Sequence, residues 1–192
     1  MSRLAVFAYA SLVDPASAAE TLERPVEFAA LARLEGWSRG WTVARDNSAS
    51  EKTFARLDGS LPDFCLGLDL APDPGAAPPN GVLIEVTEVE LARLDLREIR
   101  YSRFDVTEAI VTDAEGFDAT YAYRARPEHH RPEPPPGSII ISTYPAAIEA
   151  AFAALGPDQL ELYRATTVPP PVEVVEATLI ADAIPEGNPR AW

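Results

Sequence analysis

Runs of apolar residues predict a chain that is built mainly from β-strands. Residues 4–9 form a continuous apolar run, which is typical of a buried strand. Shorter apolar or alternating runs predict further strands at 36–44, 64–70, 81–86, 104–112, 119–125, 137–143 and 172–181. The four residues 113–116 end in glycine and lie between two of these runs, so a hairpin is the simplest connection there.

Helical signals are fewer and are interspersed among the strands. Residues 87–90 read Thr-Glu-Val-Glu, a capping box that predicts a helix from there to about 98. Apolar positions one turn apart predict helices at 145–155 and, after a glycine stop, at 157–163. A further helix is expected at 14–23. Because no regular strand–helix–strand repeat is present, we expect an α+β fold and not a doubly wound sheet.

The prolines separate these segments and do not interrupt them. Of the 19 prolines, many fall in clusters within 72–79, 132–136 and 169–171. Proline ends helices and central strands, so each cluster predicts a loop. The length of 192 residues fits one compact domain. We therefore expect residues 1–192 to form a single domain, with an extended tail at 183–192.

The charge excludes several classes of partner. Lys and Arg number 16 against 30 Asp and Glu, which makes this an acidic protein with a net charge of −14. Nucleic-acid binding needs a basic face, and docking on anionic lipid needs basic clusters. No apolar run approaches the ~18 residues of a membrane span. We expect no nucleic-acid partner and no membrane association.

Cysteine and histidine are too sparse to suggest a metal centre. Cys65 is the only cysteine, so neither an intrachain disulfide nor a cluster of zinc thiolates can form. This fits a reducing compartment, and we expect a cytoplasmic location. His129 and His130 are the only histidines, in a polar, proline-rich loop where no third strong ligand is suitably spaced. No metal site is expected.

One carboxylate stands on the apolar face of the predicted helix after residue 87. Leu91, Leu94 and Glu98 are spaced i, i+3 and i+7, so they share one stripe of a helix. A carboxylate that loses hydration holds its proton to higher pH unless it is paired, which suits general acid–base catalysis. Two other interpretations remain open. The helix frays before Glu98, or Glu98 pairs at the surface with Arg97, Arg100 or Arg103.

Five short segments occur in a characteristic order. They are Tyr-Ala-Ser-Leu at 9–12, Gly-Trp-Ser-Arg-Gly-Trp at 36–41, Asn-Gly-Val-Leu-Ile-Glu-Val-Thr at 80–87, Leu-Asp-Leu-Arg-Glu-Ile-Arg-Tyr at 94–101 and Ser-Thr-Tyr at 142–144. The ordered set resembles the γ-glutamylcyclotransferase-like family. That family carries Tyr-Gly-Ser-Leu at a strand-to-loop junction and Leu-Asp-x-x-Glu-x-x-Tyr around a glutamate.

The resemblance implies a fold and an activity. The implied fold is a small mixed β-barrel, partly closed, with peripheral helices. The implied enzyme is a transferase or lyase that converts a small γ-glutamyl amide to 5-oxoproline and releases an amine or amino acid, as in glutathione-related metabolism. Family members need neither a metal nor an organic cofactor.

The resemblance also implies roles for particular residues. Glu98 matches the catalytic glutamate, which takes a proton from the substrate's α-ammonium group and returns one to the leaving amine. The 9–12 loop offers backbone N–H groups to the substrate carboxylate or to the oxyanion. Tyr101 lies beside Glu98 if the helix continues that far; for Tyr101 and Tyr144, ordinary packing is the alternative. The implied substrate-binding residues are Tyr9, Ala10, Ser11, Leu12, Tyr101 and Tyr144.

Ala10 is the main departure from the family pattern. The family usually has glycine there, which permits a positive φ or a close approach of the backbone to a ligand. A methyl group can narrow the pocket or tilt an amide. Two hypotheses therefore stand: an enzyme that cyclises γ-glutamyl amides, and a non-catalytic small-molecule-binding or interaction domain on the same fold.

Overall fold

The computed structural model describes residues 2–184, 186, 188 and 189, and it confirms the α+β class. The strands are β1 (Leu4–Ala8), β2 (Ala30–Leu34), β3 (Trp37–Asp46), β4 (Lys52–Arg56), β5 (Phe64–Pro72), β6 (Asn80–Val86), β7 (Tyr101–Asp105), β8 (Ile110–Thr112), β9 (Ala119–Ala125), β10 (Ser138–Ile141), β11 (Val174–Val175) and β12 (Ala177–Asp182). The helices are α1 (Pro15–Leu22), α2 (Glu88–Arg97), α3 (Thr143–Leu155) and α4 (Pro157–Ala165), with short 3₁₀ turns at Ser11–Val13 and Thr107–Ala109.

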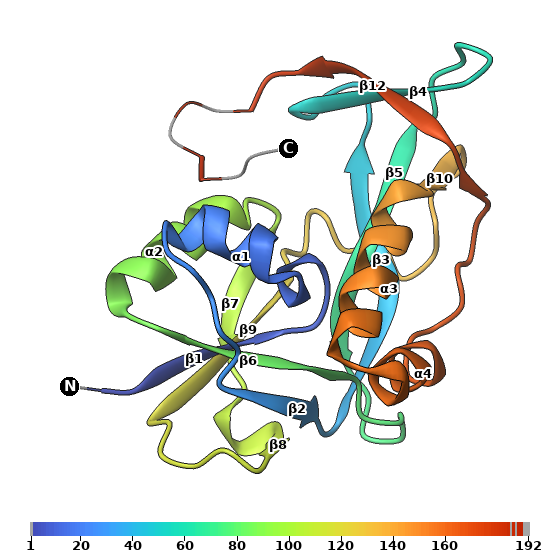
Figure 1. Cartoon of the computed structure of the whole chain (residues 1–192). Coiled ribbons are helices and arrows are strands. Elements are labelled where there is room, and N and C mark those ends of the chain that lie inside the picture. The colour runs from blue at the N-terminus through green and yellow to red at the C-terminus, as the bar shows by residue number, and fades with distance from the viewer. Residues whose placement is uncertain (1, 185, 187, 190–192) are drawn as a thin grey trace.

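The strands form a curled half-barrel of mixed sheets, as the fold prediction requires. The largest sheet has the order β7-β9-β1-β6-β2-β8, and a second has the order β11-β10-β5-β3. β12 pairs with β4 in a two-stranded ribbon. Strand β1 is central in the first sheet, because it pairs antiparallel with β6 and parallel with β9. Figure 1 shows α1 and α2 at one side of the half-barrel and α3 with α4 on the side of β3 and β5.

Burial explains why β1 has a continuous apolar sequence. All of its residues are buried, so the strand packs on both faces and no alternation of apolar and polar residues is needed. Leu91 and Leu94 of α2 are each 1% exposed and belong to the same apolar core. The capping box predicted at 87–90 is present and starts α2 at Glu88. The end of β1 and the end of α2 are therefore held on one core.

The predicted strand at 104–112 is interrupted at 106–109, and only its first two residues pair with β9 as the predicted hairpin requires. Asp105 Oδ1 accepts hydrogen bonds from the backbone N–H (2.9 Å) and the hydroxyl (2.6 Å) of Thr107. This local turn ends β7, and a 3₁₀ turn follows before β8. β7 pairs antiparallel with β9, whereas β8 pairs with β2. The periodicity of apolar residues does not reveal an Asx-type turn inside an apolar run.

Strands β2 and β4 are absent from the sequence prediction. Each has five residues, and neither contains a long apolar run. β2 is held by pairing with β6 on one side and β8 on the other, and β4 by pairing with β12. Their partners lie far along the chain, so tertiary pairing and not local propensity defines them.

Part of the expected tail at 183–192 can be placed. Residues 185, 187 and 190–192 lie outside the described residues. Asn188 Nδ2 donates a hydrogen bond to the Leu96 carbonyl oxygen at 2.7 Å, and the Pro189 carbonyl oxygen accepts one from Thr21 Oγ1 at 3.4 Å. Both contacts bring the described part of the tail to the helices α1 and α2. The single-domain assignment remains a prediction.

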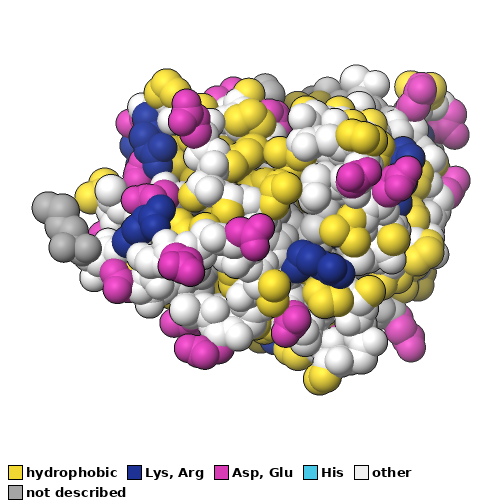
Figure 2. Space-filling view, turned by 60° about the horizontal axis from the view of Figure 1, so that its bottom comes forward, with side chains coloured by type: hydrophobic (Ala, Val, Ile, Leu, Met, Phe, Trp, Pro, Cys, Tyr) yellow, Lys and Arg dark blue, Asp and Glu magenta, His cyan; other side chains and the backbone are white. Residues whose placement is uncertain are grey.

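The surface agrees with the acidic composition. In Figure 2, Asp and Glu side chains are spread across the face that is turned forward, whereas Lys and Arg side chains are few there. None of the helices in the described part of the chain is both long and apolar enough to span a bilayer.

Gly81 of β6 allows the close approach of β1. A Cβ atom at this position would lie 2.2 Å from the Ala8 carbonyl oxygen and 2.8 Å from Cε2 of Phe7. We expect Gly81→Ala to lower the free energy of unfolding by about 2–4 kcal/mol, because backbone and core must shift. Gly40→Ala is the control, since its Cβ meets Val168 at an ordinary 3.6 Å. Urea unfolding measures the free energy of unfolding of both variants. Equal stability of Gly81→Ala and Gly40→Ala would contradict the prediction.

Candidate active site

A small pocket lies where the end of β1 meets the residues that follow α2. Its volume is about 40 Å³. The structure brings to it every site residue predicted from the sequence, although this placement does not test their roles. The lining residues are Val6, Phe7, Ala8, Tyr9, Ala10, Ser11, Leu12, Leu68, Glu98, Tyr101, Tyr123 and Tyr144.

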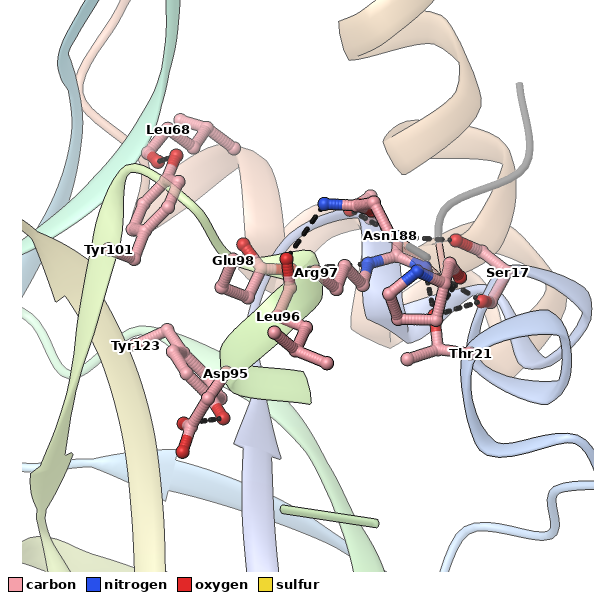
Figure 3. A network of polar contacts seen from close by, with 12 residues as sticks. Ser17, Thr21, Leu68, Asp95, Leu96, Arg97, Glu98, Tyr101, Tyr123 and Asn188 are labelled. Atoms are coloured by element: carbon pink, nitrogen blue, oxygen red, sulfur yellow. Dashed lines mark hydrogen bonds and ion pairs between the residues drawn. The ribbon is translucent and has the colours of Figure 1, made fainter. Parts of the chain in front are cut away.

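Glu98 is a buried carboxylate that lines this pocket. The residue is 8% exposed and directly follows the last residue of α2. Its backbone N–H donates to the Leu94 carbonyl oxygen at 2.9 Å, so the helical stripe continues to Glu98 although α2 ends at Arg97. Figure 3 shows Glu98 between the rings of Tyr101 and Tyr123 on one side and Arg97 on the other.

Arg97 pairs with Glu98 inside the protein. Arg97 Nε donates to Glu98 Oε1 at 3.2 Å, and their side chains are 4% and 10% exposed. The pairing interpretation of the sequence is thus correct about the partner and wrong about the place, because the pair is not at the surface. A buried charge next to an opposite charge is held in one geometry, since neither can leave for water.

Arg97 also ties the pocket to α1, a role that the sequence reasoning did not assign to it. Its guanidinium donates to the Ser17 carbonyl oxygen (2.9 Å), Ser17 Oγ (2.8 Å) and Thr21 Oγ1 (2.6 Å). It also reaches Ser11 Oγ at 3.5 Å. The available signal was the spacing from Leu94 to Arg97, which is i, i+3 and directs the side chain toward the interior. Arg97 therefore connects the 9–12 loop, α1 and Glu98.

The backbone of the 9–12 loop is fixed by a buried arginine. Arg39, which is fully buried, donates from Nη1 to the Tyr9 carbonyl oxygen at 3.0 Å. The peptide bond is planar and trans, so the N–H of Ala10 points away from Arg39. The first hydrogen bond of the 3₁₀ turn runs from the Val13 N–H to the Ala10 carbonyl oxygen at 3.0 Å. Because the donors of the turn begin at Val13, the N–H groups of residues 10–12 are not used in the hydrogen bonds of the turn.

The backbone at position 10 does not adopt a positive φ. Its φ is −138° and its ψ is −128°, a combination outside the extended and helical regions. The positive φ that makes glycine necessary in other loops is not needed here. Ala10 is one of the residues that line the pocket, so the effect expected from its additional methyl group is steric.

The tyrosine hydroxyls around the pocket are engaged in hydrogen bonds. Tyr9 donates to the Tyr123 carbonyl oxygen (2.8 Å), Tyr101 to the Leu68 carbonyl oxygen (2.8 Å) and Tyr123 to Asp95 Oδ1 (2.7 Å). Burial raises the pKa of Tyr9 and of Tyr123, so both phenols are neutral at physiological pH. They shape the pocket as neutral groups.

Tyr101 and Tyr144 reach the pocket from elements other than α2. Tyr101 is the first residue of β7, so the expectation that it shares a helix face with Glu98 is wrong. Helix α2 ends at Arg97 and does not reach Tyr101. Tyr144 is in the first turn of α3, where its ring meets Trp41 edge-to-face at 6.1 Å.

The histidine loop contains a specific contact that the sequence did not indicate. Nδ1 of His130 lies 3.0 Å from Oδ2 of Asp69, which is buried in β5. Within the described ranges of the chain, no three His, Cys, Asp or Glu side chains are placed to hold a metal ion.

The comparisons with known proteins support the fold. No protein-family model matches the sequence, and no curated protein matches it. A solved structure of a γ-glutamyl cyclotransferase aligns with a TM-score of 0.61 and 15% identity, covering 91% of this chain and 95% of that one. The human uncharacterized protein loc79017 aligns with a TM-score of 0.59 and 17% identity, covering 92% and 95%.

A third structure is a γ-glutamyl cyclotransferase specific to glutathione from yeast. It aligns with a TM-score of 0.54 and 15% identity, covering 85% of this chain and 96% of that one. These likenesses confirm the fold that the sequence motifs predicted. At such identities they establish the fold alone.

Proposed function

We propose that this protein is a cofactor-independent γ-glutamylcyclotransferase-type enzyme that converts a γ-glutamyl amide to 5-oxoproline. Glu98 carries the proposal: a carboxylate that is 8% exposed lines the same pocket as the 9–12 loop. A buried carboxylate at a pocket is a candidate for acid–base work. The cyclotransferase fold supports the proposal. A chain with one cysteine fits a reducing compartment, so a cytoplasmic reaction is part of the proposal.

The first half of the reaction needs a base. The substrate's α-ammonium group gives a proton to the Glu98 carboxylate, and the free amine attacks the γ-carbonyl carbon. A carbon–nitrogen bond forms, the five-membered ring closes, and the electron pair of the carbonyl moves to oxygen. We assign the N–H groups of Ala10, Ser11 and Leu12 to the substrate's negative oxygen atoms, because fixed backbone amides stabilise such charge without reorganising.

The second half needs an acid. The oxyanion collapses, the bond from the γ-carbon to the leaving nitrogen breaks, and the protonated Glu98 gives its proton to that nitrogen. After the attack the ring nitrogen still carries two hydrogens, and the second of these protons passes to the departing amine. The products are 5-oxoproline and the amine as its ammonium ion, and Glu98 is again a carboxylate. One group serves both steps because the proton that it takes is the proton that it returns. The Arg97 guanidinium holds the carboxylate in place through both steps.

The test is a direct assay of product. The protein is incubated with γ-glutamyl amino acids, glutathione and γ-glutamyl amines, and 5-oxoproline is quantified by mass spectrometry. We expect 5-oxoproline to accumulate in proportion to enzyme and time with at least one of these classes. Absence of product with all three classes at millimolar substrate would overturn the proposal.

A second candidate is a non-catalytic domain that binds a small molecule on the same fold. Ala10 favours it, because a residue larger than the usual glycine lines a pocket of only about 40 Å³. A γ-glutamyl compound that raises the melting temperature without forming product would support this candidate. Activity gained by Ala10→Gly would instead indicate an enzyme whose loop restricts the substrate.

A further inference from the structure

A larger chamber opens beside the Glu98 pocket. Its volume is about 440 Å³, and it shares Ser11, Tyr101 and Tyr144 with the pocket. Residues of the buried strand β1 line one part of the pocket, and the three shared residues lie between the pocket and the chamber. If the γ-glutamyl end is held at Glu98, the group attached to its γ-carbon enters the chamber.

One part of the chamber wall is apolar. Val43 of β3 and Leu66 of β5 contribute to it from the second sheet. Phe54 and Leu179 contribute from the β4–β12 ribbon, in which they are directly paired. A chamber lined in this way gains free energy when it buries hydrocarbon or an aromatic ring.

The charged part of the chamber is predominantly basic. Four cationic side chains line it against a single carboxylate, in a chain whose net charge is −14. They are Arg45, Lys52, Arg97 and Arg100, and the carboxylate is Glu51. Arg100 forms two hydrogen bonds with Glu51, one from Nη1 at 2.9 Å. The chamber thus concentrates positive charge in an acidic protein.

Among the described residues, Arg45 forms no direct ion pair with an Asp or Glu, although the charge of Glu51 acts on it from farther away. Its Nη1 donates to Ser50 Oγ at 2.8 Å and to the Lys52 carbonyl oxygen, and its guanidinium lies 5.1 Å from the centre of the Phe54 ring. Burial is the main cause that lowers the pKa of Arg45, whereas Cys65 and Glu51 raise it. A ligand carboxylate in the chamber would give Arg45 a direct ionic partner, since the planar guanidinium matches a carboxylate.

We propose that the chamber receives the leaving amine of the substrate, and that it selects amines that carry a large apolar group together with a carboxylate over uncharged amines. Arg45 is the residue that determines this specificity. The inference rests on the proposed function, because the chamber is assigned to a leaving group only if the adjoining pocket holds a γ-glutamyl group.

The test uses two substrates that differ by one carboxylate. γ-Glutamyl-phenylalanine and γ-glutamyl-phenethylamine have the same γ-glutamyl group and the same ring. We expect kcat/KM for 5-oxoproline formation to be about tenfold or more higher with the first, the usual scale of one charge-assisted hydrogen bond. In Arg45→Gln this preference should fall toward one, with the larger loss on the carboxylated substrate.

Two further variants keep the test decisive if Arg45→Gln does not fold. Leu179→Glu places a negative charge on the chamber wall at a residue that is 38% exposed, and it should reduce the same preference. Arg56→Gln is the control on the same ribbon, because Arg56 pairs with Glu173 and does not line the chamber. It should leave the preference unchanged.

The outcomes separate the two proposals. If neither substrate yields 5-oxoproline while other γ-glutamyl compounds do, or if both react equally well in the wild type, the chamber assignment fails and the cyclotransferase stands. A preference that survives both Arg45→Gln and Leu179→Glu also overturns the assignment. If no γ-glutamyl compound reacts at all, the proposed function fails and the inference fails with it.

Discussion

Glu98→Gln is expected to lower kcat/KM for 5-oxoproline formation by about 10²–10⁴-fold, the range that a general acid–base group contributes. The amide keeps the shape of the side chain and an oxygen that accepts from Arg97 Nε, so the buried contact at 3.2 Å can persist. It cannot take a proton from the substrate's ammonium group. The loss should therefore fall on kcat, measured at saturating substrate, with a small change in KM.

Glu88→Gln is the matched control for this experiment. Glu88 is in the first turn of the same helix, is exposed and does not line the pocket. It should retain full activity. The melting temperatures of both variants show whether the fold is intact. If folded Glu98→Gln forms 5-oxoproline as fast as the wild type, Glu98 is not the acid–base group and the proton must move through another residue.

Arg39→Met is expected to lower the free energy of unfolding by about 3–5 kcal/mol, because several buried acceptors would lose their donor at once. Arg39 is fully buried and donates to the carbonyl oxygens of Tyr9 (3.0 Å) and Asn80 (2.8 Å) and to Thr167 Oγ1 (2.8 Å). Its guanidinium also lies 4.4 Å from the centre of the Tyr163 ring. Methionine retains the apolar contact and removes every donor.

Arg33→Met is the control for the stability measurement. Arg33 is exposed on β2, so its replacement should change the free energy of unfolding by less than about 0.5 kcal/mol. Both variants are measured by urea unfolding at pH 7. Burial lowers the pKa of Arg39 to about 10, so the guanidinium is still charged under these conditions. A loss below about 1 kcal/mol for Arg39→Met would show that water or rearranged side chains satisfy the acceptors.

The candidate site could be predicted from the sequence because its central residue lies in a strong local pattern. The spacing of Leu91, Leu94 and Glu98 requires only that a helix forms, and the capping box at Thr87 starts that helix. The segment Leu4–Ala8 is apolar throughout, so its burial follows directly from its composition. These features belong to a few neighbouring residues, and tertiary contacts did not overturn them.

The partners of the site could not be predicted in the same way. Arg97 is one of several arginines near Glu98. Its spacing from Leu94 directs its side chain inward, but no local rule shows that it pairs there with Glu98. The hairpin expected after Phe104 does not form as predicted, because Asp105 makes a turn and β8 pairs with β2. The chamber is lined by residues of β3, β4, β5 and β12, which are far apart in the sequence. Contacts between such distant segments produce no periodic pattern in the sequence.

By itself, the sequence determined the class of fold, the buried strand β1 and the carboxylate on the apolar stripe, because each depends on interactions within one or two turns or strands. Only the tertiary structure decided that Arg97 pairs with Glu98 inside the protein, that Arg39 fixes the Tyr9 carbonyl, and that a basic chamber adjoins the pocket. The physical reason is that a buried charge is stable only where partners from distant segments meet it, and that meeting is a property of the packed chain.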